Sequence, residues 1–201
     1  MSKKVTKEWA LDFLRAHQPM PADSDFDDDS NALEDWEVTI EYLIEHPCEE
    51  AIPLVLNSFG GGNGYGLYRD TLDFIKRFPI ETIVPYLTEA LRSPNVAGRE
   101  MVAEIAAEQV DRINTDSISP AFLESIKSFA KATIDVLVNC YPKMDKMSCL
   151  DSEVLGIVVG LDEKLLLDWE KYGQTILECR ERDSDEDNLE MYDEIIEHHR
   201  G

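Results

Sequence analysis

The chain has 201 residues, of which 42 are Asp or Glu and 19 are Lys or Arg, so its formal net charge is −23. A hydrophobic content of 43% is typical of a soluble globular protein, whereas the charge disfavours nucleic acid or an anionic membrane as a direct ligand and favours a basic partner. The alternative, an acidic cytosolic protein whose charge serves only solubility, fits this composition equally well.

The N-terminal segment is predicted to form a helix over residues 5–16, because Val5, Trp9 and Phe13 recur at i, i+4 and i+8. Charged residues interrupt its apolar side chains, so it lacks the apolar run of a secretory signal. No stretch of the chain approaches the ~20 apolar residues of a membrane span. The cysteines show no CxxC spacing and are expected to be reduced and mostly buried. Together these features indicate a cytoplasmic protein.

Residues 22–30 (ADSDFDDDS) are predicted to form an exposed loop, because one apolar side chain stands among many acids. Ser30 or Asn31 is expected to cap the next helix by accepting from a free backbone N–H. That helix ends before Pro47. Its inward-facing residues are Leu33, Trp36, Ile40, Leu43 and Ile44.

A repeat with a period of 32 residues follows, since residues 47–66 (PCEEAIPLVLNSFGGGNGYG) align without a gap with residues 79–98 (PIETIVPYLTEALRSPNVAG). Five of the twenty aligned positions are identical, against roughly one expected by chance, and such a period is typical of helix-pair repeats. The identities pair Pro47, Glu49, Pro53, Asn63 and Gly66 with Pro79, Glu81, Pro85, Asn95 and Gly98 in that order.

Each unit of this repeat, 47–78 and 79–110, is predicted to be a helix, a turn rich in Gly, Pro or Asn, and a return helix. Pro47 and Pro79 suit the first helical position, because proline has no N–H to leave unsatisfied there. Apolar stripes face each other in the second unit, on Ile83, Leu87 and Leu91 and on Met101, Val102, Ile105 and Ala106. One such hairpin cannot bury its surface alone, so neighbouring hairpins are expected to stack on it.

Residues 83–108 (IVPYLTEALRSPNVAGREMVAEIAAE) resemble a HEAT-type repeat, with a first helix, a turn rich in Pro and Asn, and an Arg that opens a helix dense in Ala and Val. Arg99, and Arg69 in the preceding unit, lie near the usual Arg position, although their offsets differ by two residues. The usual Asp of the turn is missing, with Ser93 and Asn95 in its region. The resemblance implies a curved stack of helix pairs that serves as a binding surface rather than as a catalyst.

The next helix is predicted to begin at about Ser119, with Pro120 at its first position and Pro142 after its end. Its stripe comprises Phe122, Ile126, Phe129, Thr133 and Leu137. Residues 143–151 form a polar connection. Residues 152–161 (SEVLGIVVGL) are apolar enough for a buried strand, but no partner strand exists in the chain, so a short buried helix is predicted.

The C-terminal region is predicted to contain two more helices, separated by a charged turn over residues 180–187. The first carries Leu165, Trp169, Tyr172 and Ile176, and the second carries Leu189, Tyr192 and Ile196 and ends at His199. The whole chain, residues 1–201, is therefore expected to be one all-α domain of about nine or ten helices. The HEAT resemblance makes this an α-α superhelix of stacked antiparallel helix pairs.

Two acid-rich segments invite a calcium interpretation. Residues 23–34 place carboxylates at positions 1, 3, 5, 7 and 12 of an EF-hand-like loop, and residues 183–194 repeat most of the pattern. However, Asp28 and Asn188 replace the glycine required at position 6, and an acid-rich chain matches this spacing often. The segments are therefore interpreted as solvated loops at helix starts, with no metal expected.

The sequence contains no usable catalytic signal. The run GGGNGYG lacks the spacing of a phosphate-binding loop and is interpreted as a turn. The four histidines are few and scattered, and neither HExxH nor GxSxG occurs. Glu194 and His198 lie at i, i+4 and could hold a metal together with Glu190, but a polar helix end explains this spacing more simply. We expect neither catalytic residues nor a cofactor, and hence no enzyme.

The remaining function is binding. Small acidic helical proteins of this kind resemble the bacterial immunity proteins that neutralise toxins, which implies an acidic surface that occupies a basic partner such as a nuclease. The alternative is a metal-dependent (calcium or magnesium) enzyme or regulator that uses the Asp-rich loops. The residues expected to bind the partner are Asp23, Asp25, Asp27, Asp28, Asp29, Asp183, Asp185, Glu186 and Asp187.

Overall fold

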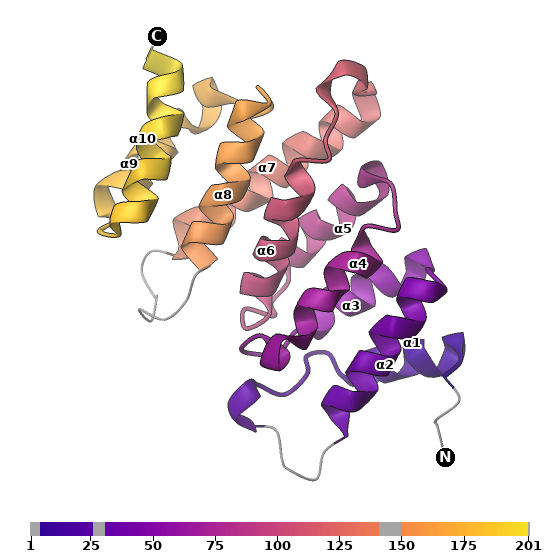
Figure 1. Cartoon of the computed structure of the whole chain (residues 1–201). Coiled ribbons are helices and arrows are strands. Elements are labelled where there is room, and N and C mark those ends of the chain that lie inside the picture. Colours follow the sequence, from indigo (N-terminus) through magenta and orange to yellow (C-terminus); the bar gives the residue numbers. More distant parts are fainter. Residues whose placement is uncertain (1–4, 26–30, 141–149, 201) are drawn as a thin grey trace. The chain divides into compact units, whose positions relative to one another are not determined.

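The computed structural model describes residues 5–25, 31–140 and 150–200, and these ranges are all-helical, with no β-strand (Figure 1). Their ten α-helices are α1 (Lys7–Ala16), α2 (Ala32–Glu45), α3 (Ile52–Ser58), α4 (Thr71–Ile75), α5 (Ile80–Arg92), α6 (Arg99–Val110), α7 (Pro120–Cys140), α8 (Leu150–Glu163), α9 (Trp169–Arg182) and α10 (Glu186–Arg200). Short 3₁₀ segments lie at Asp23–Asp25, Glu49–Ala51, Gly64–Asp70 and Thr115–Ser117. The predicted all-α class is confirmed, and the predicted polar connection over residues 143–151 lies mostly outside the described residues.

The chain forms two compact units, Met1–Val102 and Ala103–Gly201, and the sequence of α6 spans the boundary between them. The expectation of one domain over residues 1–201 stays a prediction. No described helix combines the length and the apolar character that crossing a membrane requires.

An aromatic cluster lies at the centre of the N-terminal unit. The ring of Trp36, from α2, lies 5.1 Å from that of Tyr68 and 5.9 Å from that of Phe59, and all three side chains are fully buried. Tilted and edge-on packing of this kind stabilises aromatic pairs beyond their buried area. The Tyr68 hydroxyl accepts a hydrogen bond from the Gly60 N–H at 3.3 Å, so the buried phenol has a partner. The cluster therefore holds α2 against the glycine-rich turn that follows α3.

The two turns of the sequence repeat share one hydrogen bond, made by the same residue types. The Oδ1 atom of Asn63 accepts from the Gly66 N–H at 3.0 Å. The Oδ1 atom of Asn95 accepts from the Gly98 N–H at 3.2 Å. These are two of the identities in the alignment, so the repeat is expressed in the local structure of its turns.

Asn95 also links the second turn to the first. Its Nδ2 atom donates to the carbonyl groups of Asn57 and Phe59, at 3.2 and 2.9 Å, at the end of α3. A Cβ atom at Gly98 would lie 2.6 Å from the Phe59 carbonyl oxygen, so this close approach requires glycine. α3 and α5, the first helices of the two repeat units, pack against each other.

The first repeat unit departs from the predicted helix pair. Pro47 precedes a 3₁₀ turn and α3 begins only at Ile52, while Pro79 is the N-cap of α5, so neither proline is at the first helical position as predicted. The return segment starts as a 3₁₀ stretch with Tyr65 at φ +54°, and α4 has only five residues. In the glycine run before α4, Gly62, Gly64 and Gly66 have positive φ angles, which are incompatible with a continuous helix. That the two units superimpose stays a prediction.

Three helix starts show how closely capping follows the sequence. α1 begins two residues later than predicted, where the Thr6 hydroxyl accepts from the Trp9 N–H. Ser119 caps α7 as predicted, by accepting from the Phe122 N–H at 3.2 Å. Asn31 is the N-cap residue of α2, but its side chain makes no capping hydrogen bond, because its backbone is not in the extended conformation that a cap requires. The alternative cap, Ser30, lies outside the described residues.

α8 is the central helix of the C-terminal unit, where it packs against both α7 and α10. Its buried side chains confirm the buried helix predicted over residues 152–161 and include Val154, Leu155, Ile157, Val158 and Leu161. A Cβ atom at Gly160 would lie 2.8 Å from Cγ1 of Val110, so the glycine permits close packing at this point.

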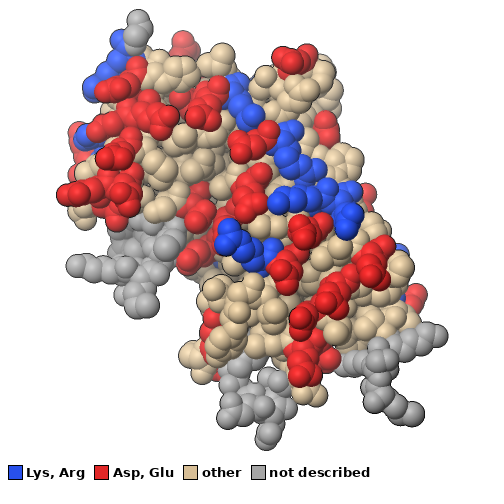
Figure 2. Space-filling view, in the orientation of Figure 1, with Lys and Arg blue, Asp and Glu red and all other residues tan. Residues whose placement is uncertain are grey.

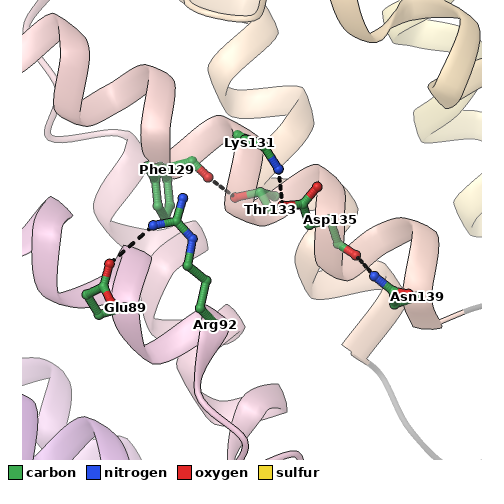
Figure 3. A network of polar contacts seen from close by, with 7 residues as sticks. All are labelled: Glu89, Arg92, Phe129, Lys131, Thr133, Asp135 and Asn139. Atoms are coloured by element: carbon green, nitrogen blue, oxygen red, sulfur yellow. Dashed lines mark hydrogen bonds and ion pairs between the residues drawn. The ribbon is translucent and has the colours of Figure 1, made fainter.

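α7 has a buried hydroxyl on its apolar face (Figure 3). The predicted stripe of Phe122, Ile126, Phe129, Thr133 and Leu137 is buried. The Thr133 hydroxyl donates to the Phe129 carbonyl at 3.0 Å, which leaves no unpaired polar group on this stripe. On the exposed side, Lys131 forms an ion pair with Asp135.

Two predictions about the C-terminal region are wrong. Leu165 does not belong to α9: it is 76% exposed at φ +57°. The Leu165 and Leu166 N–H groups donate to the carbonyls of Asp162 and Leu161, which is the Schellman pattern that ends a helix with a left-handed residue. The charged turn predicted over residues 180–187 is limited to residues 183–185, because α9 continues to Arg182 and α10 begins at Glu186.

Replacing Leu87 or Ile105 with Ala is expected to lower the free energy of unfolding by about 2–5 kcal/mol each, because both side chains are fully buried. Val96 is 63% exposed, so Val96→Ala is the control and is expected to change it by less than about 0.5 kcal/mol. Chemical denaturation measures all three. Losses at Leu87 and Ile105 as small as that of the control would show that the apolar stripes do not form the core.

Candidate functional site

The negative charge is concentrated at the two ends of the sequence. Residues 1–50 contain 14 Asp and Glu against 4 Lys and Arg, and residues 151–201 contain 16 against 5. The segment between them, residues 51–150, is nearly balanced, with 12 against 10. The candidate residues identified from the sequence, at 23–29 and 183–187, both fall in the acidic ends.

In the first Asp-rich segment, the described carboxylates are engaged locally. Asp23 accepts from the backbone N–H groups of Asn63 and Gly64, at 3.2 and 3.0 Å, and so stabilises the glycine-rich turn. The Ser24 hydroxyl donates to Asp25 at 3.1 Å. The other three candidates, Asp27, Asp28 and Asp29, lie outside the described residues.

The second Asp-rich segment forms the junction of α9 and α10. Asp185 Oδ1 accepts from the N–H groups of Asp187 and Asn188, at 3.0 and 3.2 Å, and therefore caps the start of α10. Asp183 accepts from the Asp185 N–H and from the Asn188 side chain. Glu186 and Asp187 are exposed in the first turn of α10, where a negative charge suits the helix start.

Each Asp-rich segment leads into a helix that presents a row of exposed glutamates at spacings of three and four residues. The α2 acidic row consists of Glu34, Glu37, Glu41 and Glu45, and the α10 acidic row consists of Glu186, Glu190, Glu194 and Glu197. Figure 2 shows acidic side chains aligned over α2 and gathered over α10. Among the described residues, none of these eight carboxylates has an ion-pair partner.

The α2 acidic row borders an open groove that has a volume of about 510 Å³ and is lined by both apolar and acidic side chains. Val5, Val38, Glu41, Tyr42, Ile44 and Glu45 line it. Its apolar members are half-buried, so they remain accessible. An aromatic and aliphatic patch with a charged rim is the usual composition of a protein-binding surface.

The α10 acidic row is held by buried residues on the opposite side of the helix and by a bidentate ion pair. Tyr192, Ile195 and Ile196 are buried beneath it. Arg180 on α9 donates to both carboxylate oxygens of Asp193, at 2.6 and 2.9 Å. This guanidinium lowers the pKa of Asp193 below its ordinary value. The contact ties α10 to α9.

The last turn of α10 meets the end of α8 at a buried carboxylate. Asp162 is 4% exposed, and its two oxygens lie 2.7 Å from Nδ1 of His198 and 2.6 Å from Nε2 of His199. The Trp169 ring stacks on His199 with a centroid distance of 4.5 Å and an interplanar angle of 4°. This is the one group of three His, Cys, Asp or Glu in the described ranges whose ligand atoms all lie within 4.8 Å of one another.

The cluster differs from the one that helical spacing suggested. The spacing connected His198 with Glu194 and Glu190 and was interpreted as a polar helix end, whereas the structure brings His198 together with Asp162 and His199. No sequence signal links Asp162 to the histidines, because 36 residues separate it from His198. Of the four cysteines, Cys48 and Cys179 are free, and burial raises the pKa of the Cys179 thiol to about 11, which makes it a poor nucleophile.

Comparison of the chain with models of protein families, with curated proteins and with solved structures gave no match. Function is therefore inferred from the geometry and charge of the described residues.

Asp185→Ala is expected to lower the free energy of unfolding by about 1 kcal/mol, because it removes the acceptor for two backbone N–H groups at the start of α10. Glu190→Ala, at an exposed position of the same helix, is expected to change it by less than about 0.5 kcal/mol. Thermal or chemical denaturation compares the two variants. Equal effects would contradict the capping role.

Proposed function

We propose that the protein is a non-catalytic binding module whose acidic surface occupies a basic protein partner. Among such modules, the immunity-type inhibitor of a basic nuclease toxin is the class that suits it best, and we place it in the cytoplasm. The proposal includes a HEAT-like stacking of the helix pairs, which would present the outer helices as a continuous surface. The observation that carries it is the α2 acidic row beside the groove that Val38, Tyr42 and Ile44 help to line.

The electrostatics of the α2 acidic row favour a cationic partner. Like charges at i, i+4 destabilise a helix by about 0.2–0.5 kcal/mol per pair, and Glu37, Glu41 and Glu45 form two such pairs. No ion pair with a described residue relieves this repulsion. A Lys- or Arg-rich surface would relieve it on binding, and complementary potentials of this kind also accelerate association.

The groove beside the α2 acidic row supplies apolar contact area in addition to the charge. Tyr42, Val38 and Ile44 offer accessible apolar area, and aromatic anchors of this sort carry much of the binding energy in protein interfaces. Trp36, Ile40 and Leu43 are buried on the opposite side of α2, so the surface stands on a firmly packed helix. A nuclease has a basic nucleic-acid site, which an acidic surface of this type would complement.

Neutralising the α2 acidic row tests the proposal once cross-linking in cells has identified the partner. The quadruple variant Glu34→Gln, Glu37→Gln, Glu41→Gln and Glu45→Gln is expected to slow association by roughly tenfold or more at low salt and to flatten its salt dependence. The matched control changes four exposed glutamates of the C-terminal unit that are not among the expected partner-binding residues. It combines Glu181→Gln, Glu190→Gln, Glu194→Gln and Glu197→Gln and is expected to slow association by less than about threefold. Stopped-flow measurements at several ionic strengths compare the variants.

Two outcomes would contradict this assignment. Equal slowing by the two quadruple variants would show that only the net charge matters, and association that is indifferent to salt would exclude electrostatic complementarity altogether. Tyr42→Ala provides a separate test of the groove, since loss of an anchor is expected to increase the dissociation rate with little effect on association. If the partner is a nuclease, loss of its activity on binding the wild-type protein provides the functional readout.

A further inference from the structure

We propose that Asp162, His198 and His199 bind a divalent transition-metal ion of the zinc class. Two imidazole nitrogens and one carboxylate oxygen are the ligand set of many open zinc sites, in which water occupies the fourth position. The inference is independent of the proposed binding function, because it concerns other residues and another chemistry.

The geometry of α10 directs two neighbouring histidines to one carboxylate. Consecutive helical residues point about 100° apart. Two neighbouring histidines that used the same ring nitrogen would therefore not direct it to the same point. Here His198 uses Nδ1, the nitrogen near its backbone, whereas His199 uses Nε2, the far one. The two rings therefore meet at Asp162 from different distances and directions, and the stacked Trp169 ring fixes the plane of His199.

The position of Asp162 is fixed from the other side. Asp162 lies in the last turn of α8, and its carbonyl accepts from Leu165 in the Schellman turn that ends the helix. Leu165 adopts a left-handed backbone conformation, which is unfavourable for a residue with a bulky side chain. Backbone strain of this kind is concentrated at functional sites. The Asp162 carboxylate is thus almost fully buried and held in one position, unlike the carboxylate of an exposed side chain.

An ion could replace the two hydrogen bonds if the three ligand groups rearranged around it. Tetrahedral zinc holds nitrogen and oxygen at about 2.0–2.1 Å, which places ligand atoms about 3.3 Å apart. The two nitrogen–oxygen separations are now 2.7 and 2.6 Å, and the ligand atoms of all three residues lie within 4.8 Å of one another, so binding would require shifts of up to about 1.5 Å. In the metal-bound form, each imidazole would carry its proton on the ring nitrogen that faces away from the ion and would present the lone pair of the other nitrogen to the ion.

A hollow beside the cluster gives an ion access and leaves room for water. It has a volume of about 340 Å³ and is lined by Val159, Asp162, Glu163, Glu194, Ile195 and His198. The carboxylates of Glu163 and Glu194 give its wall a negative charge, which attracts a cation.

The ligand types decide between classes of metal. Calcium and magnesium take oxygen ligands, commonly six or more in the case of calcium, whereas imidazole suits zinc, nickel, cobalt and copper. The cluster contains two nitrogens and one buried carboxylate, so it fits the second class. This differs from the calcium alternative considered for the Asp-rich segments. A bound ion would link the end of α8 to the end of α10 within the C-terminal unit.

Calorimetric titration of the full-length protein with ZnCl₂ tests the proposal, with CaCl₂ and MgCl₂ as comparison ions. We expect one equivalent of zinc with a dissociation constant of ~10 µM or tighter and no comparable binding of the other two. Asp162→Asn and His199→Gln are expected to weaken zinc binding by at least about tenfold, since loss of even an outer-shell partner costs about 10–100-fold. His46→Gln, at an exposed histidine of the N-terminal unit, is the control and is expected to leave it unchanged.

Imidazole ¹⁵N resonances provide a second readout that needs no substitution in the cluster. On addition of zinc, those of His198 and His199 are expected to shift to metal-bound values while those of His46 do not. The proposal is overturned by the absence of zinc binding, by equal affinities in all variants, or by unchanged resonances of the two histidines. If Asp162→Asn does not fold, the wild-type resonances decide the question alone.

Discussion

Mutual repulsion among 42 carboxylates is the constraint on which the arrangement of this protein depends. The folded chain must bring these groups closer together than the unfolded chain does, so burial of apolar surface has to offset their repulsion. The helices that carry the acidic rows meet this requirement directly. α2 buries Trp36, Ile40 and Leu43, and α10 buries Tyr192, Ile195 and Ile196, on the side opposite the carboxylates. Core and charged surface are therefore opposite faces of the same helices.

The uneven distribution of charge along the chain separates two kinds of surface. The nearly balanced segment 51–150 includes most of the repeat, in which Asn95 and Gly98 form the hydrogen bonds and close contacts of a turn. The acidic ends supply α2 and α10, and the glutamates of their acidic rows have no ion-pair partner among the described residues. At the end of α10 the same acidity borders a buried carboxylate with two histidines, which is a different chemical environment from an open row of glutamates. α10 thus carries both a solvent-exposed row of glutamates and the two histidines of the Asp162 cluster.

Apolar periodicity was sufficient to predict α2 and α7, because a buried stripe is a property of one helix and its sequence. α8 was predicted differently, from the lack of a partner for a strand over residues 152–161. The return segment of the first repeat was mispredicted, because the alignment does not reveal the positive φ angles of its glycine run. The acidic rows were not predicted as a binding surface, because glutamates spaced by three or four residues are typical of any solvated helix face. The aspartate runs form a more distinctive pattern and were predicted instead. The Asp162 cluster depends on packing of α8 against α10, which no local pattern encodes.

The hydrogen bonds of Asn95 explain why an asparagine suits this turn and an aspartate would not. Its Nδ2 donates to two carbonyl groups, and an ionised carboxylate has no proton to donate. Asn63, its equivalent in the alignment, accepts from Gly66 through Oδ1 only, which a carboxylate does equally well. An aspartate at position 63 would therefore keep the hydrogen bond of the first turn, whereas an aspartate at position 95 would place a negative charge against the Asn57 and Phe59 carbonyls in the second. The link between the two turns therefore depends on the side-chain amide of Asn95 remaining an amide.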